Sequence, residues 1–91
     1  MRVLRSRRLD RLLRKLDPSL RNDAIATLAL FARDSSNRGL NFEKLQGAEE
    51  LYSIRINRNF RIILRPANEP NTFEVWRIGS HDIYRKSGGD D

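Results

Sequence analysis

The chain has 91 residues, the size of a single domain, and it contains no cysteine and only one histidine. These counts exclude disulfide bonds and leave too few ligands for a zinc site. No segment has the roughly 20 consecutive apolar residues of a membrane span. Eighteen lysines and arginines outweigh 12 acidic residues and give a net charge of +6, which leaves three interpretations open: a nucleic-acid surface, a site for an acidic protein, or a merely solvated basic surface.

The N-terminal half is predicted to be helical after a short first strand over residues 2–5. Ser6 can cap the first helix, and Asp17 and Pro18 end it and begin a second, because aspartate is a favoured N-cap and proline is tolerated at the first helical position. The second helix is expected to end near Asp34, so the two helices form an antiparallel hairpin. Four leucines define the apolar face of the first helix: Leu9, Leu12, Leu13 and Leu16.

Three antiparallel strands are predicted after Leu51. Apolar and polar residues alternate over 52–57 and 60–65, and two asparagines between these segments suit a hairpin turn. A third strand is expected over 73–78. Together these elements predict an α+β domain over residues 1–85, with a two-helix hairpin on a small twisted, mainly antiparallel sheet of three to four strands. Residues 86–91 are expected to form a flexible tail.

The predicted hairpin sets Arg55 directly opposite Arg61. A turn centred on Arg58 gathers the apolar residues on one face and both arginines on the other, where like charges destabilise a sheet. We interpret the pair as a site for an anionic group and expect the Arg61 side chain to face solvent. The alternative is that both arginines simply point into water, where their repulsion is screened.

A histidine, a carboxylate and a phenol lie close together in sequence at His81, Asp82 and Tyr84. Cleavage of RNA by its 2′-hydroxyl needs a base, an acid for the leaving oxygen, and cations for the charge at phosphorus. His81 can serve as acid or base near neutrality, and Tyr84 can stack on an exposed nucleobase. The alternative is that His81 is an ordinary surface residue and Tyr84 covers the edge of the core.

The order of these segments resembles the RelE/ParE superfamily of bacterial toxins. The blocks that carry the resemblance are 9–17, 39–47, 52–57 with 60–64, and 75–84. The resemblance implies a RelE-like, microbial RNase-type fold. It also implies a cytoplasmic endoribonuclease that cleaves mRNA on the ribosome, uses no cofactor or metal, does not bind a membrane, and is inhibited by a cognate antitoxin in a hetero-oligomer.

The resemblance also assigns residues to the site. By position, the catalytic set is Arg55, Arg61, His81 and Tyr84. We also expect four further cations to bind RNA: Arg58, Arg65, Arg77 and Lys44. The middle strands lack the glutamate that some active members carry as a candidate base. Two alternatives therefore stay open, a ParE-like gyrase inhibitor that is not an enzyme and a catalytically inactive RNA-binding relative.

Overall fold

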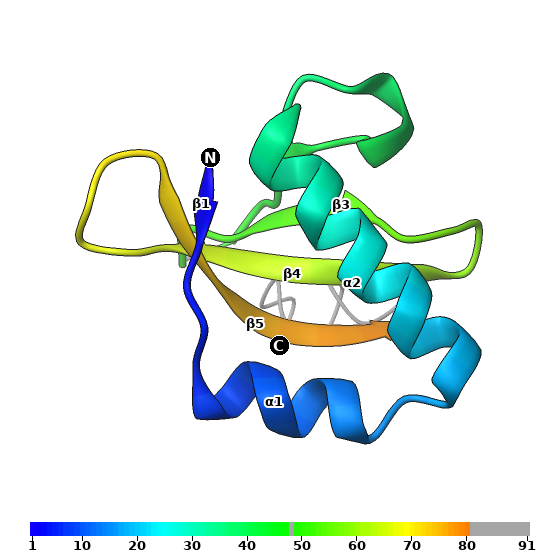
Figure 1. Ribbon diagram of the computed structural model, residues 1–91. Coiled ribbons are helices and arrows are strands. Elements are labelled where there is room, and N and C mark those ends of the chain that lie inside the picture. Colours follow the sequence, from blue (N-terminus) through cyan, green and yellow to red (C-terminus); the bar gives the residue numbers. More distant parts are fainter. Residues whose placement is uncertain (48, 81–91) are drawn as a thin grey trace.

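The computed structural model describes residues 1–47 and 49–80, which form two α-helices packed on a five-stranded sheet (Figure 1). The strands lie in the order β1-β5-β4-β3-β2, with β1 parallel to β5 and the other neighbouring pairs antiparallel. This arrangement confirms the predicted α+β class. The elements in chain order are β1 (Arg2–Val3), α1 (Arg7–Arg14), α2 (Pro18–Arg33), the 3₁₀ helix η1 (Arg38–Leu40), β2 (Glu43–Lys44), β3 (Tyr52–Arg55), β4 (Phe60–Pro66) and β5 (Thr72–Ser80).

The strand count is higher than the three to four that the sequence predicted. The unexpected strand, β2, has only two residues, which is too short for the alternation that reveals a strand in a sequence. β1 is shorter than the predicted segment 2–5, and β5 is longer than the predicted segment 73–78. The predicted domain end at residue 85 and the tail 86–91 lie outside the described residues.

Both helices begin at the predicted caps. The Ser6 hydroxyl accepts a hydrogen bond from the Leu9 amide at 3.1 Å, and the Asp17 carboxylate accepts one from the Leu20 amide at 2.9 Å. Each side chain thereby satisfies one of the amides that a helix leaves without a partner at its first turn. Neither helix in the described part of the chain is long and apolar enough to cross a membrane.

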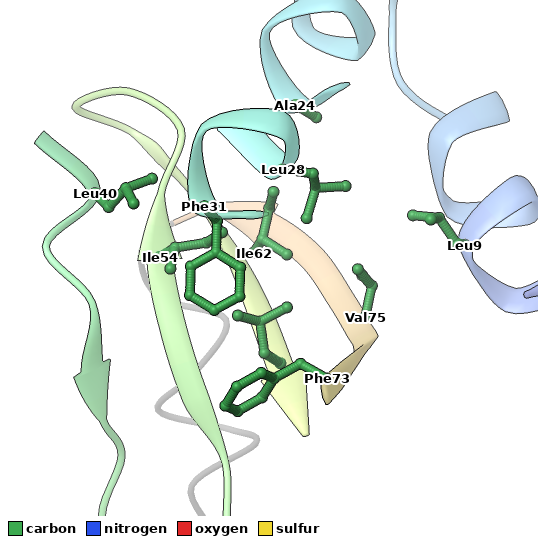
Figure 2. Close-up of a cluster of buried hydrophobic side chains, with 10 residues drawn as sticks. Leu9, Ala24, Leu28, Phe31, Leu40, Ile54, Ile62, Phe73 and Val75 are labelled. Carbon is green, nitrogen blue, oxygen red and sulfur yellow. The ribbon is translucent and has the colours of Figure 1, made fainter. Parts of the chain in front are cut away.

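The main core lies between the helices and one face of the sheet, which we term the first face (Figure 2). α2 crosses this face while α1 lies along β5 (Figure 1). Phe31 of α2 is fully buried and meets the rings of Phe42 and Phe73 edge-on, at centroid distances of 5.0 and 5.6 Å. The buried members of the cluster are Leu9, Ala24, Leu28, Phe31, Leu40, Ile54, Ile62, Leu64, Phe73 and Val75.

The hairpin between β3 and β4 has the predicted register. Ile54 lies opposite Ile62 in the core, and Arg55 lies opposite Arg61. The Asn57 side-chain oxygen accepts hydrogen bonds from the Asn59 and Phe60 amides, which closes the turn around Arg58. The alternation of the strands therefore sends Arg61 to the opposite side of the sheet from the main core, which we term the second face.

The second face has a smaller apolar cluster of its own. Leu45, Leu51 and Ile63 are buried there, and Trp76 packs against them. The register between β4 and β5 shifts between Ile63 and Leu64, so that Trp76 is the extra residue of a β-bulge. This bulge sends both Trp76 and its neighbour Arg77 away from the main core.

Candidate nucleic-acid interface

Three polar side chains from neighbouring strands meet on the second face. Arg61 of β4 directs its Nη1 atom toward the Ser53 hydroxyl of β3 at 3.4 Å and toward the Glu43 carboxylate of β2 at 3.9 Å. Ser53 is fully buried, whereas the Glu43 side chain is 44% exposed. The three residues, which we term the Arg61 cluster, thus extend from the sheet to solvent.

The surroundings of Arg61 correct one prediction and add a residue that the sequence did not place there. Its side chain is only 14% exposed, because it lies along the sheet toward β2 and does not face solvent as expected. The middle strands β3 and β4 contain no glutamate, as the sequence indicated, but the pairing of β2 with β3 sets Glu43 directly opposite Ser53. The sequence contains no periodic signal for this pairing because β2 has two residues. The one available signal is the block 39–47, in which Glu43 lies.

The Arg61 cluster combines groups that RNA cleavage by a 2′-hydroxyl requires. A guanidinium can bind phosphate oxygens and stabilise the negative charge that develops on them during the attack. An exposed carboxylate such as Glu43 can accept the proton of the attacking hydroxyl. Among residues 1–47 and 49–80, no group of three or more acidic, histidine or cysteine side chains is arranged to bind a metal ion.

The structure brings only some of the predicted residues to this cluster. Arg55 is exposed beside Arg61 at the end of β3, as predicted, and Arg58 is exposed at the tip of the hairpin turn. Lys44 lies opposite Tyr52, whose ring packs against the main core, so strand alternation directs Lys44 to the first face. Lys44 thus lies on the opposite side of the sheet from the Arg61 cluster, and its role in RNA binding stays a prediction.

Two further predicted cations lie on the second face near Trp76. Arg77 is exposed on β5 directly after the bulge. Arg65 forms an ion pair with Glu74 at 3.1 Å, and its guanidinium carbon lies 4.1 Å from the centroid of the Trp76 ring. The predictions for His81 and Tyr84 concern positions outside the described residues, and they stay predictions.

Sequence reasoning missed the contact between α1 and the second face. The guanidinium carbon of Arg8 also lies 4.1 Å from the Trp76 ring centroid, and its Nη1 atom is 3.5 Å from the Trp76 carbonyl oxygen. These residues are 68 positions apart in the chain, and no local pattern relates them.

A shallow apolar groove runs between the two helices on the far side of the molecule from the Arg61 cluster. It has a volume of about 230 Å³, and its most exposed apolar member is Ile25 of α2, at 48%. Arg5 lines the groove, and Arg14 of α1, which follows the lining residue Leu13, is also exposed. The groove is lined by Arg5, Leu9, Asp10, Leu13, Ile25 and Leu28.

Comparison with known proteins places this geometry in a family. A family model described as a ParE-like toxin domain matches residues 18–86. The fold is similar to that of the archaeal RelE–RelB complex from Pyrococcus horikoshii OT3, with a TM-score of 0.64 and 16% identity over 87% of this chain and 92% of that one. It is also similar to a YoeB/ParE toxin from Agrobacterium tumefaciens, with a TM-score of 0.64 and 17% identity over 89% and 99% of the two chains. No curated protein matches.

Proposed function

The chain belongs to the ParE-like toxin domain family, and on that premise we propose that it is the toxin of a toxin–antitoxin module that cleaves mRNA on the ribosome. The observation that carries the proposal is the Arg61 cluster, in which a guanidinium, a hydroxyl and an exposed carboxylate meet on one face of the sheet. Arg55 adds a second cation beside it. A gyrase inhibitor has no need of a general base beside a cation at such a site.

The proposed reaction is the attack of a ribose 2′-hydroxyl on the adjacent phosphorus. Glu43 accepts the hydroxyl proton as the O2′–P bond forms, and Arg61 stabilises the charge on the phosphate oxygens. The P–O5′ bond then breaks, and the leaving oxygen takes a proton from His81, the acid that the sequence predicts. The products are a 2′,3′-cyclic phosphate and a 5′-hydroxyl end, and no co-reactant is required.

The test is translation of a defined mRNA in vitro, with cleavage mapped by primer extension in the presence and absence of ribosomes. We expect ribosome-dependent cuts by the wild type and a loss of roughly 10²–10³ in rate for Arg61→Lys, which keeps the charge but not the fork. Glu43→Gln and His81→Ala should be similarly impaired. Arg33→Ala, an exposed arginine at the end of α2, is the matched control and should cleave normally. An intact mRNA after incubation with active wild-type protein would contradict the proposal.

Inhibition of DNA gyrase without catalysis is the second candidate, because the matching family model is named for ParE-like toxins. In that case Glu43→Gln and His81→Ala should remain as toxic to cells as the wild type. The wild type should also block supercoiling by purified gyrase. If the protein is an RNase, both variants should lose toxicity and the wild type should leave gyrase supercoiling unaffected. The toxicity and supercoiling assays therefore separate the two candidates.

We further propose that a cognate antitoxin binds the groove between α1 and α2 through an amphipathic helix with acidic flanks. The exposed Ile25 supplies an apolar anchor, and the basic surface of α1 complements acidic flanks. One of the similar structures is itself a complex, RelE with RelB. Ile25→Asp should abolish co-purification with the antitoxin encoded next to this toxin, whereas Ala26→Asp, an exposed neighbour directed elsewhere around the helix, should not.

A further inference from the structure

Trp76 holds two arginines that come from different parts of the fold. Arg8 belongs to the first turn of α1 and Arg65 to β4, and both guanidinium carbons lie 4.1 Å from the centroid of the indole ring. At this distance each guanidinium is stacked on the ring by a cation–π interaction. Two like charges are therefore held over one side chain.

The charge of this group is only partly neutralised. Arg65 has a carboxylate partner in Glu74, at 3.1 Å. In the described part of the chain, Arg8 is bound by the Trp76 ring and by the Trp76 carbonyl oxygen, and no carboxylate is paired with it. The aromatic ring orients the Arg8 guanidinium but does not neutralise its charge, because the ring carries no anionic group. An arginine held in this way is suited to bind a phosphate oxygen.

The stack also argues against a role for Trp76 in reading a nucleobase. A base that stacks on an indole needs one of its faces, and here the arginines lie over the ring. Trp76 is anchored below by Leu45, Leu51 and Ile63, which keep it in place. The ring is therefore placed to orient the two arginines.

The group lies on the same face as the Arg61 cluster. Arg61, Ile63 and Arg65 alternate along β4, so Arg61 and Arg65 point to the same side of the sheet. Four residues of a strand separate them, which corresponds to roughly 13 Å. A single-stranded RNA with one phosphate at Arg61 can therefore reach the stacked arginines with a neighbouring part of its backbone.

We propose that Arg8, Arg65 and Trp76 form a second phosphate-binding site, which holds the RNA backbone beyond the bond to be cut. The inference rests on the proposed function only in that the ligand is RNA. It extends the RNA-binding surface from the sheet to α1, because Arg8 is a helix residue. Arg8 and Arg65 are the binding residues, and Trp76 is a positioning residue.

The test measures binding without cleavage. A fluorescently labelled RNA oligonucleotide with methylated 2′-hydroxyls, which cannot be cut by internal attack, is titrated with protein at several salt concentrations, and its anisotropy is followed. Arg8→Ala and Arg65→Ala should each weaken binding about tenfold and reduce the slope of log affinity against log salt by about 0.7, the value for one phosphate contact with a single strand. Arg33→Ala, an exposed arginine remote from Trp76, should change neither quantity.

Trp76→Leu tests the positioning role, because it leaves every charge in place. We expect it to weaken RNA binding as much as Arg8→Ala does, while Trp76→Phe, which keeps an aromatic face, should recover most of the affinity. Thermal unfolding of each variant identifies any loss that is due to misfolding. The chain has one tryptophan, so RNA binding to the wild type should also change its fluorescence.

The inference is overturned if both arginine variants keep the wild-type slope, or if the wild-type protein binds no RNA at low salt. Its failure is distinguishable from failure of the proposed function. If the Arg8→Ala variant cleaves mRNA normally and its RNA affinity keeps the wild-type dependence on salt, the second phosphate-binding site alone is contradicted. A protein that never cleaves but shows the expected slopes contradicts the nuclease alone.

Discussion

Arg21 shows how one side chain can complete an element to which it does not belong. It lies in α2, yet its Nε atom donates to the Leu13 carbonyl and its Nη2 atom to the Leu16 carbonyl, both at 2.9 Å. The last carbonyls of a helix have no partner within the helix, and a cation at that end also interacts favourably with the helix dipole. Arg21 therefore caps the end of α1 and ties α2 to the turn that joins the two helices.

Replacing Arg21 should lower the stability of the domain more than replacing a typical surface residue does. We expect Arg21→Ala to lower the free energy of unfolding by about 1.5–3 kcal/mol, the range for hydrogen bonds from a charged donor. Lys15→Ala removes an exposed charge at the same turn and should change stability by less than about 0.5 kcal/mol. Urea unfolding of the two variants beside the wild type makes the comparison. Equal stability of both variants would show that the Arg21 contacts contribute little.

Tyr52 is the residue for which the structure predicts a clear change with pH. Its hydroxyl donates to the Glu50 carboxylate at 2.9 Å, and this hydrogen bond, together with burial and the negative charge of Glu50, raises the pKa of Tyr52 above its ordinary value of 10.0. A raised pKa means that the neutral phenol is favoured in the folded state. The stabilisation is thus fully present below the pKa of the unfolded chain and is lost as the pH rises through the folded value.

Glu50→Ala should bring the pKa of Tyr52 back toward 10.0, because it removes both the acceptor and the charge. An NMR titration of the tyrosine ring carbons measures the shift directly. The same substitution at Glu49, which is also exposed, is the control and should leave the titration of Tyr52 unchanged. A Tyr52 curve that does not move in Glu50→Ala contradicts the assignment.

At the scale of the element, α2 presents two aliphatic residues in opposite situations. Leu28 is 9% exposed and lies in the main core, whereas Ile25 is 48% exposed on the groove. Leu28→Ala should cost roughly 2–5 kcal/mol of stability, and Ile25→Ala less than about 1 kcal/mol. Thermal unfolding monitored by circular dichroism measures both. A small loss for Leu28→Ala would mean that α2 buries a different face.

The elements that the sequence predicts well are those with long local patterns. The heptad-like spacing of leucines and the caps at Ser6 and Asp17 predict both helices, and alternation around Arg58 predicts the β3–β4 register residue by residue. β2 is missed because two residues carry no periodicity. The alternation breaks at the bulge, where the apolar residues Val75 and Trp76 are adjacent, but only the pairing with β4 shows that this break is a register shift.

In the candidate site, too, the sequence predicts the local contacts and misses the long-range ones. The opposition of Arg55 and Arg61 follows from the hairpin register, which is local. The partners that cover Arg61 depend on which strand lies beside β3, and the partner of Trp76 depends on where α1 packs. Both are long-range contacts, set by the burial of apolar faces in the whole domain and not by any pattern near the residues themselves.

At the scale of the whole molecule, the sheet order places the first strand beside the last of the described strands. β1 runs parallel to β5, and the Arg2 amide donates to the Asn71 carbonyl at 2.8 Å. Arg2→Pro removes this donor and should destabilise the domain by about 1–3 kcal/mol more than Arg2→Ala, which loses only an exposed ion pair with Glu69. Urea unfolding measures the difference. Identical midpoints would show that β1 contributes nothing to stability.

The same sheet order has a consequence for the time at which the domain assembles during its own synthesis. α1 leaves the ribosome early, but the strand on which it packs, β5, is the last of the described elements to be made. At about 5–20 residues per second, α1 precedes β5 by roughly 3–13 s. During that interval the apolar side of α1 can contact another protein, because β5 has not yet been made. The second face, in turn, gains Arg8 only once Trp76 has been translated.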